Sequence, residues 1–195
     1  MIEIRDLTKR FGALTAVDHL SLDIGPGEVF GFIGPNGAGK STTMKILACL
    51  LKPDRGEARV CGIDCVRDPQ AIKMLLGYMP DFLGVGDDLT VDEYLQFFAA
   101  AFKIPARNGQ RRKVVDQVLT LTDLTGKRDA MVDSLSRGMQ QRLGVARVLL
   151  HEPRVLLVAE DAESLATHFA SPDFDGVPVV LERHIDRPRH VEVQV

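Results

Sequence analysis

The segment GPNGAGKS, residues 34–41, contains the residue types needed to bind phosphate, at the right spacing. It matches G-x-x-x-x-G-K-[ST] in full, between an apolar run, EVFGFIG, and a helical pattern, KSTTMKILACLL. Its glycines let backbone N–H groups turn inward around phosphate oxygens, and the helix adds its positive dipole end. The amine of Lys40 can reach the β- and γ-phosphates, and the hydroxyl of Ser41 can ligate Mg²⁺. We therefore predict a site for a nucleoside triphosphate with Mg²⁺, formed by Gly34, Pro35, Asn36, Gly37, Ala38, Gly39, Lys40, Ser41 and Thr42. The alternative, a glycine-rich turn with a chance lysine, is disfavoured by the flanking strand and helix.

The elements that must position this loop follow from the hydrophobic pattern. Residues 1 to about 33 alternate apolar and polar side chains and predict strands. From Thr90 to about Leu124 the pattern is helical, and Thr90 with Glu93 fits a capping box. The segment RVLLV, residues 154–158, returns to a strand. This alternation predicts an α/β fold with a predominantly parallel central sheet and a helical insert.

Composition narrows the class of protein. A hydrophobic content of 45%, a charged content of 26% and a net charge of −3 are typical of a soluble globular protein. The mildly acidic balance gives no electrostatic reason to expect nucleic acid as a partner. The basic run at residues 111–113 is interpreted as a solvated helix face rather than a binding patch. We find no apolar segment long enough to span a membrane and no signal peptide.

Three cysteines, Cys49, Cys61 and Cys65, are too few for a disulfide framework and indicate a reducing, cytoplasmic compartment. The stretch CGIDC brings Cys61 and Cys65 near each other in sequence. A zinc site needs four ligands, and no second pair follows, so metal binding there is disfavoured.

A second motif, LSRGMQQR at residues 135–142, resembles the L-S-G-G-Q signature of ATP-binding-cassette (ABC) ATPases. Together with GPNGAGKSTTMKILACLLKPDRG and GYMPDFLGVGDDLTVDEYLQFFA, it is most similar to the ATPase subunits of multidrug and antibiotic exporters. The resemblance runs from about Ile2 to Leu157. It implies a P-loop NTPase core of ABC type at residues 1–157, with N-terminal antiparallel strands and a helical signature subdomain at about residues 88–145.

The resemblance also implies partners and further site residues. A second ATP-binding subunit would pair head to tail, so that Ser136 and Gly138 complete the ATP site of the partner. Met139 replaces the family's glutamine, which we interpret as a tolerated variant; Ser136 as an ordinary helix cap is the alternative. Phe11 would stack on adenine, although a core role stays open. A membrane-spanning transporter subunit would hold the chain at the inner, cytoplasmic face of the cell membrane.

The family pattern fails further along the chain. Asp81 stands where the family places a glutamine that touches Mg²⁺; metal contact and simple capping of a turn both stay open. The strand after the signature helix should end in Asp-Glu, but the chain has Ala159 and Glu160. Ala159 cannot ligate Mg²⁺, whereas Glu160 stands where the catalytic glutamate would act on water. In the family, a helix and a strand separate this glutamate from a later switch histidine. His184 follows Glu160 too closely for both, so we predict that it does not serve as the switch histidine.

A different resemblance begins in the tail. The segment VVLERHIDRPRHVEVQV, residues 179–195, resembles part of the ATP-grasp domain of biotin carboxylases, which implies nucleotide-side roles for Glu182, Ile185 and His190. We therefore divide the chain at residues 157 and 158, with a cassette truncated at its C-terminal side and an atypical tail at 158–195. The join would lie near Val155 to Ala159, and a divergent cassette is the alternative.

Three hypotheses about function result. The chain is an ABC-transporter ATPase that couples ATP binding and hydrolysis to export. Alternatively, it is a nucleotide-binding module without effective hydrolysis, because the aspartate is missing. The third hypothesis is a non-functional hybrid that folds poorly because the sheet has lost its last strands.

Overall fold

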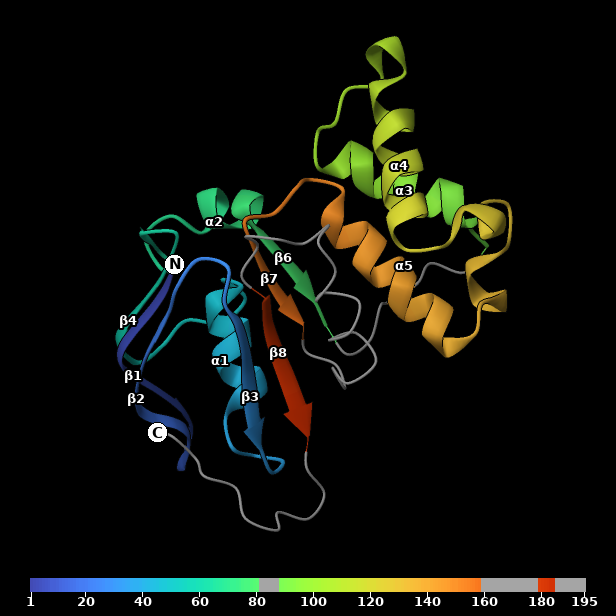
Figure 1. The fold of residues 1–195 in the computed structure, drawn as a ribbon. Helices are drawn as coiled ribbons and strands as arrows, with labels where there is room; N and C mark the ends of the chain where they lie inside the picture. The colour runs from blue at the N-terminus through green and yellow to red at the C-terminus, as the bar shows by residue number, and fades with distance from the viewer. Residues whose placement is uncertain (81–87, 159–178, 185–195) are drawn as a thin grey trace. The chain divides into compact units, whose positions relative to one another are not determined.

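The computed structural model describes residues 1–80, 88–158 and 179–184 of the 195-residue chain. The chain divides into two compact units (Figure 1). The first comprises Met1–Tyr78 and the chain from Arg154 onward, and the second comprises Met79–Pro153.

An antiparallel sheet forms one layer of the first unit. Its order is β2-β1-β4-β5, and its strands are β1 (Ile2–Phe11), β2 (Leu14–Ile24), β4 (Arg55–Val60) and β5 (Ile63–Asp64). The side chains of Ile2, Ile4 and Leu7 on β1 are fully buried. The prediction of N-terminal antiparallel strands is confirmed.

A second sheet positions the phosphate loop. Its order is β3-β8-β7-β6, and its strands are β3 (Val29–Gly34), β8 (Val179–His184), β7 (Val155–Val158) and β6 (Leu76–Met79). Strand β8 pairs in parallel with β3 on one side and with β7 on the other. All four residues of β7 are buried, as expected for a strand covered on both faces.

Helix α1 (Lys40–Leu47) packs between these two sheets (Figure 1). It contacts β2 and β4 of the antiparallel sheet and β3 of the parallel sheet, and Met44, Ile46 and Leu47 are fully buried. The helical pattern predicted a longer helix, but α1 ends at Leu47 because Cys49 adopts a left-handed φ of 58°. Helix α2 (Pro69–Leu75) was not predicted; the side chain of Asp68 caps it by accepting a hydrogen bond from Ala71 N at 3.1 Å.

The second unit is helical. It contains α3 (Val91–Ala101), α4 (Gln110–Leu121) and α5 (Arg137–Leu149), with short 3-10 turns η1 (Arg107–Gly109), η2 (Thr125–Lys127) and η3 (Val132–Ser134). Its core joins buried side chains of all three helices, among them Leu95, Leu119 and Leu143. This unit therefore has a hydrophobic core of its own.

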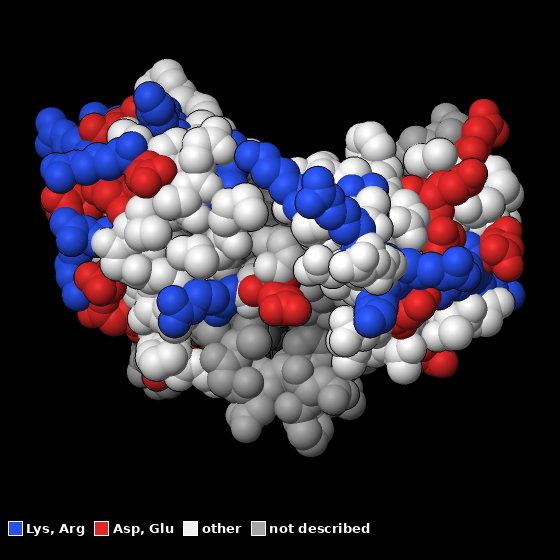
Figure 2. All heavy atoms as spheres, turned by 90° about the horizontal axis from the view of Figure 1, so that it is seen from above, with Lys and Arg blue, Asp and Glu red and all other residues white. Residues whose placement is uncertain are grey.

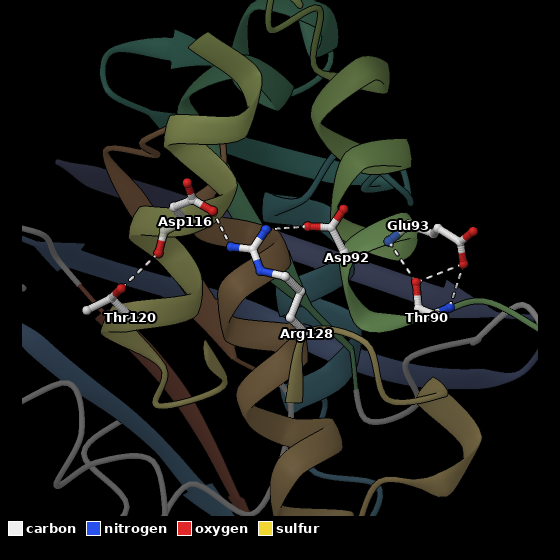
Figure 3. A network of polar contacts seen from close by, with 6 residues as sticks. All are labelled: Thr90, Asp92, Glu93, Asp116, Thr120 and Arg128. Carbon is white, nitrogen blue, oxygen red and sulfur yellow. Dashed lines mark hydrogen bonds and ion pairs between the residues drawn. The ribbon is translucent and has the colours of Figure 1, made fainter. Parts of the chain in front are cut away.

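Side-chain hydrogen bonds fix the start of α3 (Figure 3). Thr90 Oγ1 accepts from Glu93 N at 3.3 Å, and the Glu93 carboxylate accepts from Thr90 N at 2.9 Å. The Glu93 carboxylate also accepts a bond from the Thr90 hydroxyl at 2.8 Å, and its bonds from Thr90 N and this hydroxyl hold the pKa of Glu93 below its usual value. The predicted capping box is confirmed.

Arg128 joins α3 to α4 in the same network (Figure 3). Its guanidinium donates to Asp92 of α3 at 2.8 Å and to Asp116 of α4. The Arg128 side chain is only 24% exposed, so this pair of bonds is partly shielded from water. It ties α3 to α4 beside the apolar core that the two helices share.

Charges of both signs are mixed on the surface. Figure 2 shows Lys and Arg side chains beside Asp and Glu side chains over the face that it draws. Within the described ranges, every helix is too short or too polar to cross a bilayer.

Candidate nucleotide-binding site

The loop between β3 and α1 has the backbone that its glycines predict. Gly37 and Gly39 adopt left-handed φ values of 85° and 84°. A β-carbon on Gly39 would lie 2.3 Å from the carbonyl oxygen of Ala16 on β2, which is far inside contact distance. Position 39 therefore requires glycine both for its conformation and for its close approach to a neighbouring strand.

The side chain of Lys40 folds back over this loop. Its ammonium group donates to the carbonyl oxygens of Gly34 at 2.8 Å and Pro35 at 3.0 Å, and the residue is only 7% exposed. One turn along α1, the Thr43 hydroxyl donates to the Gly39 carbonyl at 3.0 Å and ties the loop to the helix. A buried cation is thus placed beside the start of α1, where a phosphate would neutralise it.

The N-terminus of α1 is suited to an anion. Its cap, Gly39, provides no side-chain hydrogen bond, and no acidic residue lies in the first turn. The positive end of the helix dipole is therefore not offset by the helix's own side chains. A cavity of about 220 Å³ opens here, lined by Phe11, Leu14, Ala16, Asn36, Gly37, Gly39, Lys40, Ser41 and Thr42.

The β1–β2 hairpin supplies the apolar side of this cavity. Phe11 and Leu14 pair across the hairpin and are 49% and 65% exposed. The Lys9 ammonium lies 5.5 Å from the centre of the Phe11 ring. An exposed aromatic ring beside a phosphate-binding loop can stack on a nucleotide base. The cavity therefore brings Phe11 together with the phosphate loop, although the two lie far apart in the sequence.

The signature segment lies in the second unit, at the start of α5. Ser136 is the N-cap, and its hydroxyl accepts from Met139 N at 3.4 Å. Both Ser136 and Gly138 are exposed, and a β-carbon on Gly138 would meet nothing within 4 Å. Met139, which replaces the family's glutamine, packs against the helical core. The start of α5 is therefore exposed, and it is capped by the side chain of its own N-cap residue.

Several predicted site residues lie outside the described ranges: Asp81, Ala159, Glu160, Ile185 and His190. Glu182 lies on β8, where its backbone pairs with Phe32 of β3.

The structure corrects one part of the prediction about His184, because a strand does fit between Glu160 and this residue. His184 ends β8, and its backbone is the register partner of Gly34, the first residue of the phosphate motif. Parallel neighbours need a crossover of only about a dozen residues or more, and the 20 residues between β7 and β8 suffice. The same strand occupies the position between β3 and β7, contrary to the idea that the sheet has lost this strand. No local sequence signal specifies this long-range pairing.

Comparison with known proteins identifies the family. Residues 17–162 match the family model described as "ABC transporter", so the chain belongs to the ABC transporter family. The chain is 40% identical over 164 residues to Nod factor export ATP-binding protein I of Paraburkholderia xenovorans, covering 84% of this chain and 53% of that protein. It is 38% identical over 192 residues to the probable multidrug ABC transporter ATP-binding protein YbhF of Escherichia coli, covering 94% of this chain and 33% of that protein. The chain thus spans about half, or less, of the length of these curated relatives.

Solved structures agree with this fold. The dimeric structure of MJ0796, a bacterial ABC transporter cassette, superposes with a TM-score of 0.82 at 26% identity, covering 95% of this chain and 88% of that one. A fold likeness at 22% identity links the chain to cbiO1 from Clostridium perfringens, with a TM-score of 0.83 and coverage of 94% and 78%. The predicted ABC-type cassette fold is confirmed.

The resemblance of the tail to biotin carboxylase is not supported. The relatives reported above are ABC proteins, and the alignment with YbhF covers 94% of the chain. Strand β8, which contains the start of that resemblance, is part of the cassette sheet. The short alternating pattern at residues 179–195 is common to many strands and was too brief to identify a family.

Proposed function

We propose that the chain binds ATP with Mg²⁺ and serves as the ATP-binding part of an ABC exporter, acting with a membrane-spanning subunit. The observation that carries this proposal is the cradle at the start of α1. There, a left-handed glycine, a buried Lys40 and a helix end without a side-chain cap all face one cavity. The family and the relatives' names, which include Nod factor export and multidrug transport, support export as the process.

Different residues of this site would bind different parts of the nucleotide. Lys40 would leave the carbonyl oxygens of Gly34 and Pro35 for the β- and γ-phosphates, and the backbone of the loop would surround the phosphate oxygens. Ser41 would ligate Mg²⁺, with Asp81 as a further candidate ligand. Phe11 would stack on the adenine ring. Bound Mg²⁺ would supply charge neutralisation between the β- and γ-phosphates.

Substitution of Lys40 tests the proposal. We expect Lys40→Ala to weaken Mg-ATP binding by about 10- to 100-fold, because a charged hydrogen bond to phosphate is lost. Lys45→Ala is a matched control, since Lys45 is an exposed lysine on the same helix. Isothermal titration calorimetry of both variants, after a folding check by circular dichroism, measures the difference. Equal affinities for the two variants would contradict the proposal.

The exposed start of α5 would complete the ATP site of a second subunit. Ser136 and Gly138 would contact the γ-phosphate held by the partner's phosphate loop, in a head-to-tail dimer. The cassette MJ0796 is a dimer in its solved structure, and cbiO1 is part of the transporter complex cbiONQ. We expect sedimentation to detect dimers with Mg-ATP and monomers without it. The membrane-spanning partner would hold the dimer at the inner, cytoplasmic face of the cell membrane.

A hydrolysis-deficient binding module is the second candidate function, and it rests on Ala159. If Ala159 occupies the position of the Mg²⁺-side aspartate, ATP would bind while turnover stays slow. The substitution Ala159→Asp would then raise turnover, with Glu160 acting on the attacking water, and Glu160→Gln in the same background would remove the gain. Turnover of the unmodified chain well above that of Lys40→Ala would contradict this candidate.

A further inference from the structure

Two of the three cysteines are brought together by the fold, and they are not the two that lie close in sequence. The sulfurs of Cys49 and Cys65 lie 3.8 Å and 3.9 Å from one atom, the carbonyl oxygen of Leu47. The two thiols are also close enough for each to affect the pKa of the other. Cys61 takes no part in this contact, although only three residues separate it from Cys65.

The end of α1 holds Cys49 in this position. Leu50 N donates to Lys45 O at 2.9 Å and Cys49 N donates to Ile46 O at 3.0 Å, the two bonds of a Schellman motif. That motif places its left-handed residue at Cys49, where φ is 58°. Glycine is the usual residue at such a position because a β-carbon is strained there. This chain instead has a cysteine at the position, and its sulfur lies near the carbonyl oxygen of Leu47.

Cys65 is fixed from the opposite side. It follows β5, and its backbone N–H donates to Ala58 O of β4 at 2.9 Å. Its side chain is 5% exposed, whereas Cys49 is half-buried and accessible to a small molecule. One residue of the pair is therefore partly exposed to solvent, and the other is buried.

The electrostatics assign different roles to the two thiols. The pKa of Cys49 is lowered by the neighbouring Cys65 thiol, with a further contribution from Lys73. The pKa of Cys65 is raised by the same contact and by burial. The accessible thiol is thus the one favoured as a thiolate, which is the attacking species in thiol–disulfide exchange.

We propose that Cys49 and Cys65 are a redox-active dithiol, which a small-molecule disulfide of the glutathione class oxidises to an intramolecular disulfide. The Cys49 thiolate attacks one sulfur of the small disulfide, so that a mixed disulfide forms and one thiolate leaves. Cys65 then loses its proton to solvent and attacks the Cys49 sulfur, and the second small thiolate leaves. The protein loses two hydrogens and the small disulfide is reduced to two thiols, so atoms and electrons balance.

The bond would pin the end of the phosphate-loop helix to the antiparallel sheet. It closes a loop of the fifteen intervening residues, residues 50–64, which restricts the unfolded chain. A reversible disulfide of this kind is compatible with a reducing compartment, where such bonds are transient and redox-sensing. Formation of this disulfide does not depend on nucleotide binding, so failure of the proposed function would leave it unaffected.

The test uses the full chain equilibrated with mixtures of glutathione and glutathione disulfide, followed by alkylation and peptide mapping. We expect a Cys49–Cys65 cross-link in the wild type and in Cys61→Ser, which retains the pair and is the matched control. Cys65→Ser should instead accumulate glutathione on Cys49. The oxidised wild type should unfold roughly 5–10 °C above the reduced form.

Three results would overturn the proposal: a cross-link that includes Cys61, disulfides only between chains, or full alkylation of all three thiols in the presence of glutathione disulfide alone. Mapping of the wild type and of Cys61→Ser decides between these results even if a substitution at Cys49 or Cys65 prevents folding.

Discussion

The helices α1 and α5 begin in opposite ways. At α1 the cap is Gly39, no side chain caps the helix, and a buried lysine lies beside the loop. At α5 the cap is Ser136, whose hydroxyl accepts a backbone hydrogen bond, and the surface around it is exposed. The first helix end depends on contact with another strand, while the second is fixed by residues within three positions of each other. The start of α1 therefore depends on a tertiary contact, whereas the start of α5 is fixed by a local hydrogen bond.

Glycine without a side-chain cap is not sufficient for such a cradle. Helix α4 also begins after a left-handed glycine, Gly109, yet a β-carbon there would meet nothing within 4 Å. Its first turn already contains Arg111, Arg112 and Lys113. What distinguishes α1 is the close approach of Ala16 to Gly39 and the lysine folded over the loop.

The largest effect should come from breaking this approach with Gly39→Ala. We expect a loss of roughly 2–4 kcal/mol in the free energy of unfolding, because the β-carbon is strained and overlaps the Ala16 carbonyl. Gly37→Ala is the control: it has the same left-handed φ but open space, and should cost about 1–2 kcal/mol. Denaturant unfolding with and without Mg-ATP measures both. Equal costs would show that the contact with β2 does not matter.

A smaller effect should follow from Arg128→Ala in the helical unit. Loss of the bonds to Asp92 and Asp116 should cost about 1–2 kcal/mol, because the guanidinium is partly buried between α3 and α4. Arg142→Ala, which removes a bond to the 91%-exposed Asp123, should change stability by less than about 0.5 kcal/mol. Hydrogen exchange of the amides in α3 and α4 reports on the unit directly. If both variants exchange alike, side-chain bridging between these helices is unimportant.

Substitution of the cap, Ser136→Ala, should have a modest effect on stability. The hydrogen bond from Met139 N is long and exposed, so we expect a loss of about 0.5–1 kcal/mol. ATP turnover should fall much further if Ser136 also contacts the partner's nucleotide. Ser134→Ala removes a hydroxyl that bonds Met131 O outside the helix, and serves as control. A fall in turnover no larger than that of the control would restrict Ser136 to capping.

The smallest effect concerns pH at the start of α3. Because the folded pKa of Glu93 lies below its unfolded value of 4.5, its contribution to stability is present above about pH 4.5. It is lost as the pH falls through the lowered folded pKa, since the protonated carboxyl no longer accepts both bonds from Thr90. Glu93→Gln should flatten the dependence of the unfolding midpoint on pH over this interval. An unchanged slope would mean that other carboxylates dominate it.

The sequence by itself determined the features that depend on neighbouring residues. The strand–loop–helix order around residues 34–41 and the Thr90–Glu93 capping box depend on residues close together in sequence, and both appear as predicted. The Ser136 cap, which was the alternative interpretation of that serine, is also present. Their hydrogen bonds form between backbone and side chains a turn apart, so residue types at fixed spacing suffice to specify them.

Only the tertiary structure decided which distant segments meet. It placed β8 between β3 and β7, with His184 beside Gly34, although the spacing had suggested otherwise. It paired Cys65 with Cys49 rather than with Cys61, and it brought Phe11 to the phosphate loop. Such contacts depend on chain crossovers and on packing between sheets and a helix, and no spacing within a local sequence motif records them.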